Sequence, residues 1–211
     1  MIITILTDNP DSWIIPYVEQ IKEKLQNHDL LHIFDKKDII KGDVLFLLSC
    51  EKLISKEDLA LNTNNIVVHP SPLPKYRGWS PLAYQIIDGL DEIVVSLFEA
   101  EAGVDSGVIY LQQSIKLDGS ELNEELKRKQ GEATVSLVLE YIPRRHHYGT
   151  PQTGTPTYCQ KKTLESSEIS PHESIIKQFN LFRVADNERY PIFFKLHGKK
   201  YILKIYEDDQ A

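Results

Sequence analysis

The sequence predicts an α/β fold built around a mainly parallel, doubly wound sheet. Two observations lead to this prediction. Short, continuously apolar segments rich in β-branched residues recur along the chain, and segments with helical apolar spacing alternate with them. Continuously apolar strands are typical of a sheet that is covered on both faces. The 211 residues are enough for one such domain, or for one domain with a small appendage.

The expected strands of this sheet are residues 1–6, 30–34, 44–48, 66–68, 93–98 and 108–115. Asp11 or Ser12 is expected to cap the helix that follows the first strand. Pro81 is expected at the first position of a second helix. Asp118 and Glu121 have the spacing of a capping box for a third, long helix, which follows the last strand.

A short helix and a β-hairpin are expected at the C-terminal end. Residues 149–156 are rich in Gly, Pro and Thr, which is typical of an irregular linker. A helix is expected at 174–179, and a hairpin turn at 197–199 joins two further strands. We therefore divide the chain into a main domain, residues 1–165, and an appendage, residues 166–211.

Composition and charge narrow the classes of function. The formal net charge is -7, from 24 Lys+Arg against 31 Asp+Glu. Such a surface repels phosphate backbones at long range, so we expect no nucleic acid as the main partner; a local pocket for a small phosphate ester stays compatible. We expect no membrane span and no signal peptide, and free thiols at Cys50 and Cys159. The protein is therefore expected in the cytoplasm.

The most informative segment is residues 65–78, Asn-Ile-Val-Val-His-Pro-Ser-Pro-Leu-Pro-Lys-Tyr-Arg-Gly. A buried strand delivers His69 onto a loop that prolines stiffen. Ligands of open α/β sheets bind at the carboxyl ends of the strands, and an imidazole there can exchange a proton near neutral pH. The alternative is a histidine that only caps the end of the strand.

A second segment, residues 99–107, also follows a predicted strand. Gly103 and Gly107 flank Asp105 and allow a tight backbone there. A carboxylate beside an imidazole fixes its tautomer and stabilises its protonated form. Taken alone, this segment is more typical of an ordinary acidic turn. Taken together, the two segments predict that His69 and Asp105 meet where two neighbouring strands end.

These motifs together resemble the catalytic domain of the formyltransferase family. The resemblance rests on residues 69–74 (His-Pro-Ser-x-Leu-Pro), 77–78 (Arg-Gly) and 104–107 (Val-Asp-x-Gly). It extends over about residues 1–165, where residues 48–54 look like the folate-binding loop of the family. The resemblance implies a Rossmann-like fold and 10-formyltetrahydrofolate as the donor of a formyl group.

The resemblance also implies roles for particular residues. His69 would act as general acid and base, and Asp105 would hold and tune it. The pterin of the folate would lie between the loop at 48–54 and the loop at 99–105. The residues expected to bind this cofactor are Lys52, Leu53, Ile54, Glu101, Gly103 and Asp105.

One position departs from the family pattern. The family usually places an asparagine two residues before the histidine, where it donates a hydrogen bond to the oxyanion, and here that position is Val67. Asn65 lies on the same strand face but ~7 Å farther back, at ~3.3 Å per residue. Losing an oxyanion donor costs ~3–4 kcal/mol, so we expect a bulge or bend that brings Asn65 into the site. The alternatives are a substitute donor or weak activity.

The expected acceptor is the amine of a nucleotide-activated 4-amino sugar, such as a UDP-linked sugar of a pseudaminic-acid-type route to bacterial surface glycans. Residues 183–194 and 198–204 look like the tail of sugar N-formyltransferases, and residues 78–81 (Gly-Trp-Ser-Pro) also appear in that branch. The short, acidic C-terminal segment does not resemble the basic tRNA-binding domain of methionyl-tRNA formyltransferases.

The candidate residues for the sugar nucleotide are Asn9, Ser12, Trp13, Lys75 and Arg77. For Trp13 the alternative is a residue packed on the core, and for Arg77 it is a solvated loop charge. The histidines at 146 and 147 do not form a metal site by spacing, because adjacent side chains point in different directions, so no metal is expected.

Two other functions stay open. One is formyl transfer to an aminoacyl group or another amine, and the other is a non-catalytic module that binds folate or nucleotide. The presence of both His69 and Asp105 argues against a loss of chemistry. The sequence is compatible with an oligomer but does not fix the oligomeric state.

Overall fold

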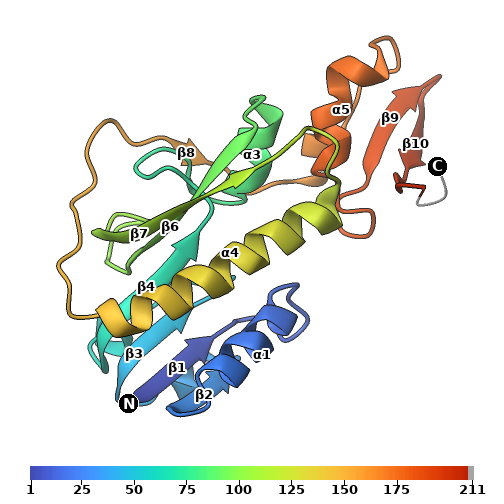
Figure 1. Ribbon diagram of the computed structural model, residues 1–211. Coiled ribbons are helices and arrows are strands. Elements are labelled where there is room, and N and C mark those ends of the chain that lie inside the picture. The colour runs from blue at the N-terminus through green and yellow to red at the C-terminus, as the bar shows by residue number, and fades with distance from the viewer. Residues whose placement is uncertain (209–211) are drawn as a thin grey trace.

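The structure is a computed structural model that describes residues 1–208 (Figure 1). Its elements in chain order are β1 (Ile2–Leu6), α1 (Ile15–Lys24), β2 (Asp29–Ile33), η1 (Lys36–Asp38), β3 (Gly42–Leu47), α2 (Lys56–Leu59), β4 (Asn62–His69), β5 (Arg77–Gly78), α3 (Pro81–Ile87), β6 (Glu92–Glu99), β7 (Ile109–Lys116), α4 (Asn123–Arg144), β8 (Tyr158–Cys159), η2 (Leu164–Ser167), α5 (Ile175–Arg183), β9 (Ile192–Leu196) and β10 (Lys199–Leu203). The predicted strands and helices are therefore present, with bounds that shift by a few residues.

The central sheet has six strands in the order β2-β1-β3-β4-β6-β7. The first four of these pair in parallel, whereas β6 pairs antiparallel with β4 and β7 pairs antiparallel with β6. The sheet is therefore mainly parallel, as predicted. The reversal at β6 matters for the site, because the carboxyl end of β6 points the opposite way from that of β4.

Successive residues of a strand face opposite sides of this sheet. On one side, α1 and α4 pack over a large apolar cluster that includes Ile66 of β4 (Figure 1). On the other side, Val67 packs on a smaller cluster, whose buried members are Leu6, Ile33, Ile39, Leu45, Leu47 and Leu59. His69 lies two residues after Val67 in the same strand, so its side chain emerges on the same side of the sheet, the side of the smaller cluster.

The predicted N-terminal helix cap is wrong. α1 begins after Ile14, and no side chain caps it. The hydroxyl of Ser12 instead donates to the hydroxyl of Ser49, at 3.0 Å, in the loop after β3. A tertiary contact between two loops has therefore taken the place of the local cap.

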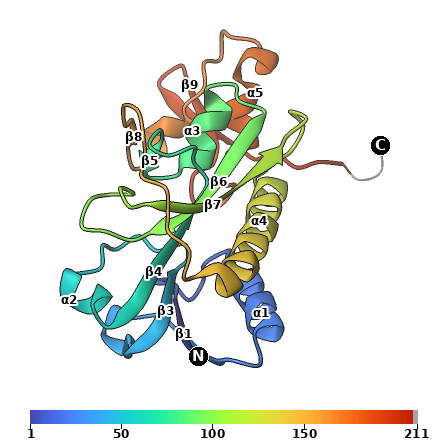
Figure 2. The same ribbon diagram turned by 60° about the vertical axis from the view of Figure 1, so that its left-hand side comes forward.

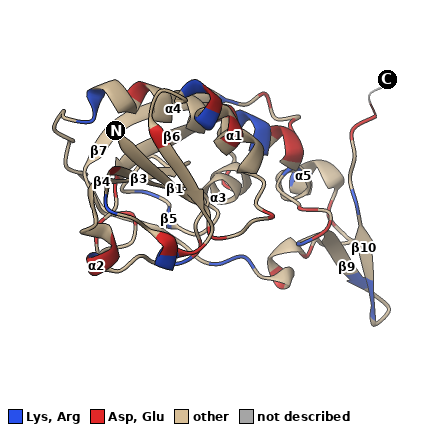
Figure 3. Cartoon of the chain, turned by 90° about the horizontal axis from the view of Figure 1, so that it is seen from below, with Lys and Arg blue, Asp and Glu red and all other residues tan. Residues whose placement is uncertain are grey.

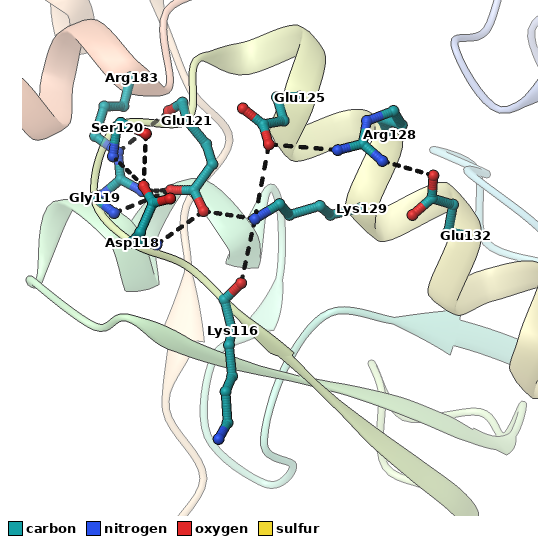
Figure 4. A network of polar contacts seen from close by, with 10 residues as sticks. All are labelled: Lys116, Asp118, Gly119, Ser120, Glu121, Glu125, Arg128, Lys129, Glu132 and Arg183. Atoms are coloured by element: carbon teal, nitrogen blue, oxygen red, sulfur yellow. Dashed lines mark hydrogen bonds and ion pairs between the residues drawn. The ribbon is translucent and has the colours of Figure 1, made fainter.

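The predicted capping box of Asp118 and Glu121 lies one turn before the helix and not at its first residues. The Glu121 carboxylate accepts the backbone N–H groups of Asp118 (2.9 Å) and Gly119 (3.1 Å), but α4 begins only at Asn123. The carboxylate closes the turn before the helix. It also lies 2.7 Å from Nζ of Lys129 and 2.8 Å from Nη2 of Arg183, so it is the centre of the network in Figure 4.

The network ties the C-terminal elements to the sheet domain. Arg183 is the last residue of α5 and is buried together with Glu121. Close by, the side chain of Asn123 donates to the carbonyl of Ala185 at 2.9 Å. α5 and the hairpin β9–β10 stand beside the sheet (Figure 1) and contribute a separate small apolar cluster. The predicted hairpin turn at 197–199 is confirmed, and the division at residue 165 stays a prediction.

No helix within residues 1–208 combines the length and the apolarity that crossing a bilayer requires. In the view of Figure 3, segments with Lys and Arg are interspersed with segments with Asp and Glu along the ribbon. Cys50 and Cys159 are free thiols, as predicted.

The Glu121 network predicts a loss of stability in acid. Burial would raise the pKa of Glu121, but hydrogen bonds from Lys129 and from backbone N–H groups outweigh it and lower the pKa to about 2. A carboxyl group whose pKa is lower in the folded than in the unfolded protein stabilises the fold at pH values above its unfolded pKa of about 4.3. This stabilisation is lost as the pH falls towards the pKa of the folded state. Glu121→Gln should therefore lower the free energy of unfolding at neutral pH by on the order of 3 kcal/mol and weaken its decline in acid.

Urea unfolding at several pH values between neutral and strongly acidic measures this effect. Glu125→Gln is the matched control, because its partly exposed carboxylate lies 3.7 Å from the same Lys129. An exposed pair contributes little, so this control should stay close to the wild type. Equal effects of the two substitutions would contradict the account of the network.

Candidate active site

His69 and Asp105 form a half-buried acid–base pair. Nε2 of His69 lies 3.3 Å from Oδ2 of Asp105, and the two side chains are 12% and 15% exposed. The backbone N–H of Gly78 donates to the same carboxylate oxygen at 2.7 Å. The predicted meeting of the two residues is thus confirmed, while their catalytic roles remain a proposal.

The route by which Asp105 reaches His69 differs from the prediction. Because β6 is antiparallel to β4, its end lies beside Asn65, where the N–H of Ala100 donates to the Asn65 carbonyl at 2.6 Å. The carboxyl ends of the two strands therefore do not meet. The loop after β6 instead folds back along β4, and only this return brings Asp105 to the histidine.

The loop that carries Asp105 is tight. Asp105 itself has a φ of 48°, in the left-handed region that few non-glycine residues adopt. Gly107 is required by close approach, since a Cβ there would collide with the carbonyl of Glu99. Such a backbone persists only where its surroundings hold it in place.

The acceptors around Nε2 of His69 assign its tautomer. Nε2 faces two acceptors, the Asp105 carboxylate and, at 3.4 Å, the carbonyl of Tyr76. A nitrogen between two acceptors carries the proton, which leaves Nδ1 with a free lone pair. Burial lowers the pKa of His69, and the Asp105 charge opposes this effect. The imidazole is therefore neutral near pH 7 and can accept a proton on Nδ1.

The predicted folate-binding loops lie on one side of the sheet. Ile54, Val67 and Ala100 all pack against the smaller apolar cluster, which joins the loop at 48–54 to the start of the loop at 99–105. The carboxylate of Asp8 holds the first loop by accepting the backbone N–H groups of residues 51 (2.7 Å) and 52 (2.8 Å). Lys52, Leu53, Glu101 and Gly103 are exposed, and Leu53 is 74% exposed although it is apolar.

The predicted sugar-nucleotide residues lie on two segments, at 9–13 and 75–77, and their joint role stays a prediction. Trp13 packs on the large cluster, with its ring edge-on to Tyr17 at 6.1 Å, so the structure supports the core alternative. This cluster lies on the other side of the sheet from Val67. Asn9 and Lys75 are exposed, and the Asn9 side chain accepts the N–H of Asp11.

Arg77 is not a solvated charge. Its Nη2 donates to Oε1 of Gln152 at 2.6 Å, and its Nη1 lies 3.5 Å from the hydroxyl of Tyr158. Its Nε is buried and has no hydrogen-bond partner among residues 1–208. The guanidinium is thus turned into the protein, toward the segment that follows α4.

The expected distortion at Asn65 is not found. β4 pairs in continuous register with β3 up to Val67, and with β6 from Ile66 to His69. The N–H of Asn65 donates to the Glu99 carboxylate at 2.7 Å, which holds this part of the strand. Within the described residues, no bulge moves the Asn65 side chain toward the histidine, and the prediction of one was wrong.

Neither cysteine offers a thiolate near neutral pH. Burial raises the pKa of Cys50 to about 12 and that of Cys159 to about 11, so neither thiol ionises near neutral pH. Three or more His, Cys, Asp or Glu side chains do not gather as metal ligands anywhere in the described part of the chain. The titratable groups that the structure brings together here are the imidazole of His69 and the carboxylate of Asp105.

Sequence reasoning missed a charged rim beside the pair. Nζ of Lys161 lies 4.2 Å above the ring of Trp79, the neighbour of Gly78, and 3.1 Å from the Glu51 carboxylate. The Arg189 guanidinium lies 3.8 Å from the same carboxylate. These residues come from four separate loops, so no sequence spacing could have joined them. It also missed Gln152, which lies in the segment expected to be a linker.

The backbone of Gly78 predicts that only glycine fits at this position without a loss of stability. Gly78 has a φ of 96°, and a Cβ there would lie 2.7 Å from the carbonyl of Cys159. Gly78→Ala should therefore lower the thermal stability by more than the ~1–2 kcal/mol of a left-handed residue alone. Gly89→Ala is the matched control, since Gly89 has a similar φ of 87° and open space around it. Equal losses for the two variants in thermal unfolding would contradict the close approach.

Comparison with known proteins agrees with the family resemblance. Residues 16–142 match the family model described as formyl transferase, and this match covers more than half of the chain. The chain is 39% identical over 180 residues to methionyl-tRNA formyltransferase of Finegoldia magna, and 31% identical over 165 residues to that of Thermodesulfovibrio yellowstonii. These alignments cover 82% and 76% of this chain but 57% and 53% of the relatives. The chain thus spans about half the length of the curated relatives it matches.

Solved structures share the fold over almost the whole chain. Methionyl-tRNA formyltransferase from Clostridium thermocellum has a TM-score of 0.82 at 22% identity, covering 100% of this chain and 94% of that one. A sugar N-formyltransferase from a Shewanella species has a TM-score of 0.74 at 13% identity, covering 99% and 98%. HypX from Aquifex aeolicus in complex with tetrahydrofolic acid has a TM-score of 0.78 at 17% identity, covering 96% and 37%. With the matched family model and the relative at 39% identity, the chain belongs to the formyl transferase family.

Proposed function

We propose that the protein transfers a formyl group from 10-formyltetrahydrofolate to an amine. The observation that carries this proposal is the partly buried contact of 3.3 Å between His69 and Asp105, next to the loops that resemble the folate-binding loops of the family. The pair supplies a proton acceptor at neutral pH, and an amine nucleophile needs one.

The reaction would proceed by addition and elimination at the formyl carbon. The amine nitrogen of the acceptor attacks this carbon, which forms the new C–N bond and a tetrahedral oxyanion. Nδ1 of His69 takes the proton that the amine loses. The bond between the carbon and N10 of the folate then breaks, and the same imidazole returns the proton to N10. Asp105 stabilises the imidazolium between these two steps.

The oxyanion needs a hydrogen-bond donor in place of the family's asparagine. Val67 offers none, and Asn65 stays behind it in a regular strand. We assign this role to the protonated Nδ1 of His69, which forms as the amine loses its proton. The buried surroundings strengthen such a charge-assisted hydrogen bond.

The folate would bind on the side of the sheet that carries the smaller cluster. Ile54, Val67 and Ala100 offer an apolar surface next to His69, and the exposed Leu53 can close over a flat ring. Lys52, Glu101 and Gly103 stand in the same two loops, where side-chain and backbone groups can contact the polar edge of a pterin.

For the acceptor, we propose the amine of a nucleotide-activated amino sugar. Its support is the rim of Trp79, Lys161 and Arg189, where a carboxylate, Glu51, already lies between two cations. A diphosphate can take that position, because both cations can bind phosphate oxygens. Trp79 follows Gly78, whose N–H donates to Asp105. The names of the two relatives from Finegoldia magna and Thermodesulfovibrio yellowstonii favour a second candidate, the aminoacyl group of a methionyl-tRNA.

An assay of formyl transfer tests the proposal. The protein is incubated with 10-formyltetrahydrofolate and a panel of amino-sugar nucleotides and aminoacyl-tRNAs, and formamide products are detected by mass spectrometry. We expect a formamide on a sugar nucleotide, and we expect His69→Ala to lose at least ~100-fold in kcat while folate binding stays nearly unchanged. Asn65→Ala should keep near-wild-type rates.

Two results would overturn different parts of this assignment. Unchanged turnover of His69→Ala would remove the imidazole from its role. Transfer to methionyl-tRNA alone would replace the sugar acceptor and keep the chemistry. Lys161→Ala adds a check on the rim, because it should raise the KM for the sugar nucleotide and leave the KM for the folate unchanged.

A further inference from the structure

Gln152 connects the loop that carries Asp105 to the turn at 77–78. Its Nε2 donates to the carbonyls of Asp105 and Gly107, both at 2.8 Å, and its Oε1 accepts from Nη2 of Arg77 at 2.6 Å. Arg77 precedes Gly78, whose N–H holds the Asp105 carboxylate. One side chain therefore links the backbone on both sides of Asp105 to the turn that binds its carboxylate.

The partners of Gln152 leave only one orientation of its amide. The guanidinium of Arg77 is a donor without acceptors, so the oxygen of the amide must face it. The two carbonyls are acceptors without donors, so the NH2 group must face them. A carboxylate at this position could satisfy the guanidinium but would repel both carbonyls. The contacts thus require a glutamine, not merely a side chain of its size.

The segment that carries Gln152 is placed to deliver this side chain. It leaves the end of α4 and runs along the molecule to β8, which pairs with β5 (Figure 2). On the way, Thr150 pairs with Ile109 at the start of β7. The same segment and β7 line a cavity of about 320 Å³, and Gln152 is one of the lining residues. The segment is thus held by strand pairing on both sides of Gln152.

We propose that Gln152 is a positioning residue for the reaction, which holds Asp105 in its left-handed conformation and in contact with His69. The φ of 48° at Asp105 is sparsely populated and needs an external constraint. The two hydrogen bonds from Gln152 are such a constraint, since they fix the carbonyls of residues 105 and 107. Arg77 acts one step farther out by orienting the amide, and this role replaces the nucleotide contact expected for it. The inference rests on the proposed function of the site.

Gln152→Ala and Gln152→Glu test this role. With the Asp105 contact loosened, kcat should fall about 10–100-fold for both variants, with little change in the KM for the folate. Gln152→Glu keeps the size of the side chain, so its loss separates hydrogen bonding from packing. Gln160→Ala is the matched control, because Gln160 is an exposed glutamine of the segment between α4 and η2. It should keep the wild-type kcat.

A second readout does not depend on turnover. The Gly78 N–H donates to a carboxylate at 2.7 Å, so its proton should resonate far downfield in the NMR spectrum. Asp105→Asn should move this signal upfield, and both Gln152 variants should move it in the same direction. A Gly78 signal at its wild-type position in the Gln152 variants would overturn the positioning role. If that signal moves but the wild-type protein formylates no acceptor, the proposed function fails and the positioning role stands.

Discussion

The arrangement of the site depends on one carboxylate oxygen. Oδ2 of Asp105 accepts the N–H of Gly78 at 2.7 Å and lies 3.3 Å from Nε2 of His69. This single atom therefore holds the loop after β4 and orients the imidazole ring. This oxygen and the Tyr76 carbonyl are the two acceptors that face Nε2, so together they place the proton on Nε2 and free Nδ1. The position of the imidazole and the shape of the loop thus depend on the same carboxylate.

The rest of the fold holds this oxygen in place at some conformational cost. Since β6 runs antiparallel to β4, the loop with Asp105 has to return toward His69, which it does through a left-handed residue. Gln152 stabilises that return from the side of β7. The C-terminal elements are fixed separately, by the buried Arg183 and Glu121 (Figure 4). They bring Arg189 to the rim, which we propose as the binding site of the acceptor.

Much of the fold could be predicted because apolar periodicity marks strands and helices directly. The motif around His69 and the glycines beside Asp105 also identified the two residues that meet at the site. The direction of β6 could not be predicted, because the apolar pattern of a buried strand is the same in both directions. The cap at Ser12 failed since Ser49, which is distant in sequence, competes for its hydroxyl. Gln152 could not be found because its partners are mostly backbone carbonyls, which carry no side-chain signature.

The most direct test of the account is an NMR titration of His69 in the wild type and in Asp105→Asn. The resonance is assigned by its loss in His69→Ala. Burial lowers the pKa of His69 and the Asp105 charge raises it, so removing the charge should lower the pKa further and move protonation to lower pH. The nitrogen shifts of the neutral wild-type ring should show the proton on Nε2. A pKa that stays unchanged or rises in Asp105→Asn would contradict the coupling on which the site depends.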